Sequence, residues 1–173
     1  MLHYQFKPYQ NTYSELFNQE KEIIKQKLPN AQIEHIGSTS VPNLSGKGII
    51  DIYVAVGKDK IKEAKKIIEK LDYQFDGKRE ENRFFFDKIK NKQKYHLHLT
   101  HTGHQDFINC VLFRDFLRTH QEYFKEYEEL KKQIFAKMKD IKTKAERRKI
   151  HSAMKDPFIA KILRLAKNSP LAC

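Results

Sequence analysis

Residues 35–56 read HIGSTSVPNLSGKGIIDIYVAV, and this stretch decides the fold. The segments 31–38 and 48–56 are short and rich in β-branched residues, a composition typical of strands. Between them the turn-forming run VPNLSG at 41–46 interrupts the pattern. We therefore predict two neighbouring strands joined by a loop.

Helices are predicted on the N-terminal side of this stretch and directly after it. Apolar residues at near-helical spacing predict a helix over 12–28, which Thr12 and Glu15 begin as a capping box. A second helix is expected to follow a cap at Asp59, with its apolar residues on one side. The apolar stripe of the first helix is expected to face the core, and the helices predicted after Gln105 are expected to cover the sheet.

The rest of the chain divides into strands and then helices. Segments 73–76, 83–89 and 95–100 predict three more strands, and the polar connectors between them have the length of hairpin loops. From Gln105 the pattern is helical, and Asp156-Pro157 predicts the start of a last helix that ends near residue 167. The whole chain, 1–173, is predicted to be one α+β domain with a mixed, largely antiparallel sheet and flanking helices.

Composition limits the class of protein and favours anionic partners. No apolar run approaches the roughly 20 residues that cross a bilayer, so no membrane role is expected. The two cysteines, Cys110 and Cys173, are too few for a disulfide framework, and residues 1–10 lack the layout of a secretory signal, which favours the cytoplasm. The net charge of +12 would attract phosphate-bearing partners, although helix lysines often serve only solvation.

Gly37, Ser38 and Asp51 carry the chemistry. The first strand ends in Gly-Ser, where backbone N–H groups and small hydroxyls can approach an anion, and Gly37 has no side chain in the way. Asp51 lies inside an apolar strand, where an ionised carboxylate is costly unless it is paired or binds a cation. A cation such as Mg²⁺ could also neutralise a triphosphate, although pairing with Lys47 or backbone N–H groups is the structural alternative.

This layout resembles that of the nucleotidyltransferase superfamily, in which Gly-Ser precedes an aspartate on an apolar strand. Four stretches more closely resemble the GrpB family: 35–52, YHLHL at 95–99, FRDFLR at 113–118 and YEELK at 127–131. The resemblance implies a nucleotidyltransferase-like fold. Because family members are in some bacteria fused to dephospho-coenzyme A kinase, it also implies a link to coenzyme A or nucleotide metabolism.

The chain departs from the superfamily at its metal ligands. The resemblance implies a second acid two residues after Asp51, yet Tyr53 stands there. The place of a third acid is held by His96 and His98, which strand alternation puts on one face. These histidines could bind a transition metal or phosphate, or could be ordinary hydrogen-bonded sheet residues.

Two hypotheses follow. In the first, the protein is a metal-dependent nucleotidyltransferase: Ser38 and Asp51 are catalytic, and Mg²⁺ or another divalent cation binds Asp51. In the second, the same scaffold is a non-catalytic module that binds nucleotide, coenzyme A or RNA. In either case the candidate phosphate contacts are those of the Gly37-Ser38 turn and four basic residues, Lys47, Arg83, Arg114 and Arg118, of which Arg114 and Arg118 could equally form helix ion pairs.

Overall fold

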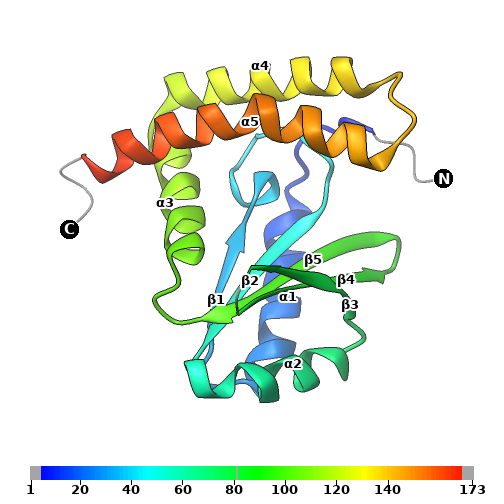
Figure 1. Cartoon of the computed structure of the whole chain (residues 1–173), viewed down its shortest axis with the longest axis vertical. Helices are drawn as coiled ribbons and strands as arrows, with labels where there is room; N and C mark the ends of the chain where they lie inside the picture. The colour runs from blue at the N-terminus through cyan, green and yellow to red at the C-terminus, as the bar shows by residue number, and fades with distance from the viewer. Residues whose placement is uncertain (1–4, 81, 169–173) are drawn as a thin grey trace.

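A computed structural model of the chain describes residues 5–80 and 82–168, which form a five-stranded sheet covered by helices (Figure 1). The strand order is β1-β2-β5-β4-β3, and only the β2–β5 pair among these described strands is parallel. The prediction of an α+β fold with a mixed, largely antiparallel sheet is confirmed. The strands are β1 (Gln32–Ile36), β2 (Ile50–Val56), β3 (Gln74–Glu80), β4 (Arg83–Lys90) and β5 (Gln93–His101).

One face of the sheet is an apolar layer against two helices. Ile52 of β2 and Leu97 of β5 are fully buried there, beneath α1 (Thr12–Lys27) and α2 (Ile61–Glu69). Each such side chain contributes about 1.5–3 kcal/mol through removal of apolar surface from water. Because successive residues of a strand face opposite sides, this layer fixes the other face as the one that carries Asp51.

The C-terminal helices cover that other face and the loop after β1. They are α3 (Gln105–Thr119), α4 (Gln121–Met138) and α5 (Lys144–Lys167), and α4 and α5 lie side by side across one end of the molecule (Figure 1). A second apolar cluster joins them to the loop, because Val41 and Leu44 pack among helix residues such as Phe116 and Ile162. This packing holds residues 37–47 between the sheet and the helix pair.

The predicted start of the last helix and two predicted helix caps are wrong. The last helix begins at Lys144, with Pro157 inside it, because Thr143 caps α5 by accepting a hydrogen bond from the Glu146 N–H at 3.2 Å. The first helix is capped by Asn11 without a side-chain hydrogen bond, so the expected capping box does not form. The turn Lys58–Lys60 precedes α2, and Asp59 is not its cap.

Other expectations differ in extent. The polar segment after residue 76 was expected to be a connector, yet β3 continues to Glu80, since pairing with β4 compensates for its weak strand composition. Cys110 is a free, partly buried cysteine of α3, and Cys173 lies outside the described residues. Within 5–80 and 82–168, no helix combines the length and apolar character that a membrane span requires.

Candidate functional site

Two pairs of polar side chains face the C-terminal helices across the parallel strands β2 and β5. The register places Asp51 opposite His96 and Tyr53 opposite His98. On the far side of β5, Asp87 of β4 pairs with His96. The structure thus brings the predicted residues Asp51, His96 and His98 onto one face of adjacent strands.

Asp51 is held by its neighbour across the strand pair. Its Oδ1 lies 3.1 Å from Nδ1 of His96, whose Nε2 lies 3.2 Å from Oδ1 of Asp87, so the imidazole bridges two carboxylates. Burial alone would raise the pKa of Asp51, but the hydrogen bond and charge of His96 outweigh it and hold that pKa below its usual value. The Asp51 carboxylate therefore stays ionised at neutral pH.

The Asp51 carboxylate leaves no room for a side chain at position 37, where the chain has Gly37. Its φ is +71°, a conformation that favours glycine, and a Cβ at this position would lie 2.3 Å from Oδ2 of Asp51. The short 3-10 turn Ser38–Ser40 follows at once. Two of its hydroxyls stabilise the turn: Thr39 donates to the Ile49 carbonyl and Ser40 to the Gly37 carbonyl.

Ser38 points elsewhere, toward Gly46. A Cβ on Gly46 would lie 2.5 Å from the Ser38 hydroxyl oxygen and 2.9 Å from Nζ of Lys131, a residue of α4. Lys131 also donates a hydrogen bond to the Ser45 carbonyl. Because Gly46 has no side chain, the Ser38 hydroxyl and the Lys131 ammonium group can both lie against it.

Three lysines from three elements gather at this loop: Lys47 beside Gly46, Lys131 of α4 and Lys155 of α5. We call them the lysine cluster. Lys155 is hydrogen-bonded to the Tyr127 side chain, and Nζ of Lys131 lies 5.4 Å from the centre of the same ring. Lys131 of α4 and Lys155 of α5 therefore both place their ammonium groups against the side chain of Tyr127.

The electrostatics show that these lysines share one region. Burial and then the charge of Lys155 lower the pKa of Lys131 to about 7. The same two causes lower the pKa of Lys47 to about 8, although Lys47 as a whole residue is exposed. His151, one turn before Lys155, has its pKa lowered to about 4 by burial and by all three lysines. The pKa of Lys155 itself is raised, by Tyr127 first and also by Asp51, so it stays charged.

The candidate arginines have structural partners. Arg114 is buried, with its guanidinium 2.6 Å from Glu34 and 2.8 Å from the His35 carbonyl oxygen. Arg118 donates two hydrogen bonds to the Ser40 carbonyl, at 2.6 and 3.0 Å. These two residues therefore hold the backbone on either side of the turn. Arg83 is 3.0 Å from Asp106, away from the lysine cluster.

The side chains around Asp51 do not complete a set of metal ligands. Tyr53 is fully buried and donates to Asp106 at 2.8 Å, and its pKa is raised by burial and by that carboxylate, so it offers no anionic oxygen. Nδ1 of His98 is buried with no hydrogen-bond partner among the described residues, and burial lowers its pKa to about 4. Across the described ranges, no three His, Cys, Asp or Glu side chains are grouped to hold a metal ion.

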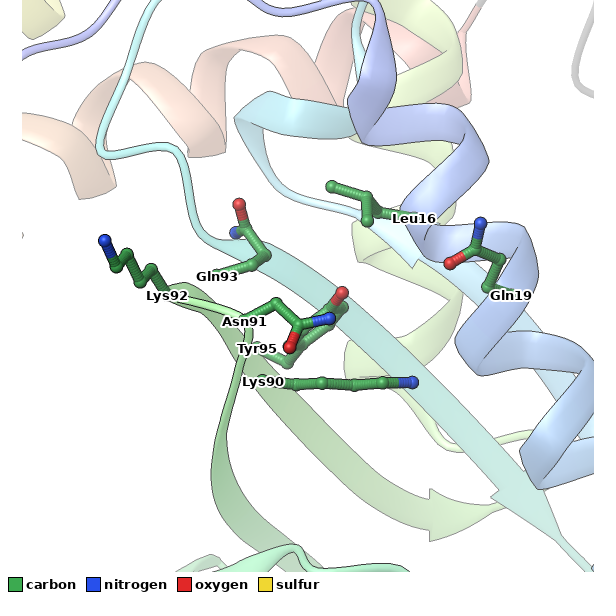
Figure 2. A pocket seen from close by; sticks show the side chains of 7 residues that line it. All are labelled: Leu16, Gln19, Lys90, Asn91, Lys92, Gln93 and Tyr95. Carbon is green, nitrogen blue, oxygen red and sulfur yellow. The ribbon is translucent and has the colours of Figure 1, made fainter.

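A cavity of about 210 Å³ lies away from these residues. Figure 2 shows Leu16 and Gln19 of α1 facing the β4–β5 hairpin across it. Tyr95 lines it and belongs to the apolar face of β5, which is opposite to the face of His96. This cavity is therefore separate from the Asp51 site.

Lys131, Lys155 and His151 were not identified from the sequence. Lys131 lies in the stretch 127–131 that carries the family resemblance, and this was the available signal. Lys155 and His151 were missed because their helix was predicted to begin only at Asp156.

Comparison with known proteins agrees with the resemblance. The family described as GrpB protein matches residues 3–165. The crystal structure of conserved protein GrpB from Enterococcus faecalis has a TM-score of 0.77 and 33% identity, and the match covers 94% of this chain and 96% of that chain. The UPF0157 protein YqkA of Bacillus subtilis is 36% identical over 138 residues, which are 76% of this chain but only 40% of that protein.

A more distant likeness concerns the fold alone. The Cid1 poly(U) polymerase, in a crystal structure with Mg 3′-dATP bound, matches at a TM-score of 0.44 and 9% identity, over 69% of this chain and 43% of that chain.

The match over residues 3–165, together with the E. faecalis structure, shows that this chain belongs to the GrpB family.

Proposed function

We propose that the protein binds the phosphate groups of a nucleotide, coenzyme A or a similar small molecule between the Gly37-Ser38 turn and the lysine cluster. One observation carries the proposal: Nζ of Lys131 and the Ser38 hydroxyl approach the same side of Gly46. Beside burial, the positive charge of Lys155 lowers the pKa values of both Lys131 and Lys47. Like charges held together in a folded protein cost free energy. A bound anion would remove that repulsion.

The turn is prepared for such a ligand before binding. Arg114 and Arg118 fix the carbonyls of His35 and Ser40 on either side of it. The Ser40 hydroxyl donates to the Gly37 carbonyl within the turn, and the Thr39 hydroxyl ties the turn to the Ile49 carbonyl. A preformed site loses less conformational entropy when its ligand binds. The Ser38 hydroxyl, which faces Gly46 and Lys131, supplies a further hydrogen-bond donor there.

Calorimetric titration tests this function. ADP and coenzyme A are titrated into the wild type, Lys131→Met and Lys62→Met, which removes an exposed lysine of α2, the helix on the opposite face. We expect Lys131→Met to weaken binding about tenfold or more, since it removes a charge-assisted hydrogen bond, and Lys62→Met to leave it unchanged. Equal affinities in both variants would refute the proposed location.

A second candidate function is metal-assisted nucleotidyl transfer. The observation that favours it is the lowered pKa of Asp51, because an ionised carboxylate beside the turn can attract Mg²⁺ or another divalent cation. Asp51→Asn should then abolish metal-dependent nucleotide turnover with little change in melting temperature. A fully active variant would exclude this candidate.

A further inference from the structure

We infer that the cavity between α1 and the β4–β5 hairpin binds a nucleobase through the Tyr95 hydroxyl and the side-chain amides beside it. The inference does not depend on the proposed phosphate binding, because the cavity and Asp51 lie on opposite faces of the sheet. Three features of the lining support it: a hydroxyl without a partner, amide groups with unused atoms, and charges that disfavour an ionic ligand.

Tyr95 presents an unused hydroxyl to the cavity. The residue is only 2% exposed, yet its hydroxyl forms no hydrogen bond with any residue that the structure describes. Tyr73, which also lies near Glu20, donates to that carboxylate at 3.0 Å. Figure 2 shows the Tyr95 oxygen pointing into the cavity on the side of Leu16. Because buried polar groups usually have a partner, a ligand in the cavity would supply the missing one.

Side-chain amides surround this hydroxyl. Gln93 uses its Nε2 hydrogens on the Gly48 and Lys94 carbonyls, at 2.7 and 2.8 Å, which leaves its Oε1 as an acceptor. Gln19 donates one long bond, at 3.4 Å, along its own helix, and Asn91 adds a further amide at the hairpin turn. Asparagine and glutamine amides match the paired donor and acceptor groups on the edge of a nucleobase, adenine in particular.

The charges near the cavity favour a neutral ligand. Lys90 lies 2.9 Å from Glu20, which also binds Lys88 at 3.0 Å, so no unpaired carboxylate is left there to attract a cation. The charge of Glu20 reaches the Tyr95 hydroxyl, because together with burial it raises the pKa of Tyr95. The same charge would repel a carboxylate or phosphate bound to that hydroxyl. Lys92 is exposed, and its ammonium group points away from the cavity (Figure 2).

The size and the apolar lining fit a planar ring. The cavity volume of about 210 Å³ equals that of about seven water molecules and is below the roughly 300 Å³ at which pockets for drug-sized ligands begin. Leu16 and the ring of Tyr95 offer apolar surface to the faces of a base, while the amides meet its edge.

The test is a ligand-observed NMR titration of adenine with the wild type, Tyr95→Phe and Tyr123→Phe, which removes a hydroxyl from α4. We expect adenine to bind the wild type and Tyr123→Phe equally, and Tyr95→Phe about three- to tenfold more weakly, as one lost hydrogen bond predicts. The melting temperature of Tyr95→Phe should equal or exceed that of the wild type, because the hydroxyl has no partner within the protein. Gln19→Leu, at an exposed position, should also weaken binding.

Two further planar probes, indole and benzoate, test the hydrogen-bonding edge and the charge. Both should bind at least about tenfold more weakly than adenine. Adenosine distinguishes the sources: binding as tight as that of adenine assigns the base to a nucleoside, and loss of binding assigns a free base.

No binding of adenine, or the same affinity in Tyr95→Phe and the wild type, would overturn the inference. Indole that binds as tightly as adenine, or benzoate that binds more tightly, would also overturn it. None of these results would affect the proposed phosphate binding, which Lys131→Met tests on the other face of the sheet.

Discussion

Oδ1 of Asp51 lies 3.1 Å from Nδ1 of His96, directly across the parallel pair of β2 and β5. The bond joins the acid that would bind a cation to a side chain that already carries a second carboxylate, Asp87, on its other nitrogen. The sheet side of the site is thus internally paired, whereas the helix side carries the lysine cluster.

Asp51→Asn separates the two accounts of the site. Because the substitution removes a negative charge near the lysines, ADP binding in EDTA should be unchanged or tighter at about pH 6.5, where the lysines are protonated. His96→Gln, which leaves the charge of Asp51 in place, is the control. A loss of ADP binding in Asp51→Asn that appears only in the presence of Mg²⁺ would instead favour a metal held by Asp51.

Ligand binding should take up protons. An anion beside Lys131 and Lys47 raises their pKa values from about 7 and about 8, so affinity is full below these values and falls as pH rises through the higher pKa values of the complex. Titration at about pH 8 in buffers of different ionisation enthalpy measures the uptake. Lys131→Arg should reduce it, since arginine stays charged throughout this range. A buffer-independent heat in the wild type would contradict the expectation.

Gly37→Ala should destabilise the protein more than Gly103→Ala. Both glycines have positive φ, +71° and +78°, so both variants incur the backbone strain of about 1 kcal/mol. Only at Gly37 would the new Cβ meet the Asp51 carboxylate, at 2.3 Å, whereas at Gly103 nothing lies within 4 Å. Urea unfolding should show a further loss of about 1–3 kcal/mol for Gly37→Ala. Equal losses would mean that the carboxylate moves away freely.

Glu20 is a buried acid that stabilises the fold from the opposite face. It accepts hydrogen bonds from Lys88 at 3.0 Å, Lys90 at 2.9 Å and Tyr73 at 3.0 Å. Glu20→Gln should cost about 3–5 kcal/mol in free energy of unfolding, because Lys88 would remain buried without its acid. The control Glu69→Gln, in an exposed pair with Lys65, should cost about 1 kcal/mol or less.

The pH dependence of stability has a defined sign at Glu20. Burial would raise its pKa, but the hydrogen bonds of Lys90 and Lys88 prevail and lower it. The contribution of Glu20 is therefore complete above the unfolded pKa of about 4.3 and is lost as pH falls through the lower folded value. Urea unfolding between neutral and acidic pH should show a smaller acid-dependent loss in Glu20→Gln than in the wild type.

The sequence predicted the sheet side of the site because its signals are local. An aspartate inside the apolar run 49–56 marks β2, and the alternation at 95–99 puts His96 and His98 on one face. The register that pairs them with Asp51 and Tyr53 required the structure, since it depends on the long-range parallel pairing of β2 with β5. The boundary of β3 was missed for a similar reason, because pairing overrides composition.

The helix side could not be predicted in the same way. Lys131 and Lys155 reach the turn only because Val41 and Leu44 pack into the second core with residues of all three C-terminal helices. In the sequence they are two lysines among the 34 basic residues, with the spacing of ordinary solvated helix faces. The Thr143–Glu146 cap was readable from the sequence and would have extended α5 back to include Lys155.

Titration of ADP in EDTA into the wild type, Lys131→Met and Lys62→Met tests the central claim most directly. The account predicts metal-free binding to the wild type and to Lys62→Met, and affinity about tenfold or more weaker in a folded Lys131→Met. Folding of each variant is checked by circular dichroism and by its melting temperature. The same affinity in all three proteins, or binding that appears only after Mg²⁺ is added, would contradict the claim that the lysine cluster neutralises the ligand.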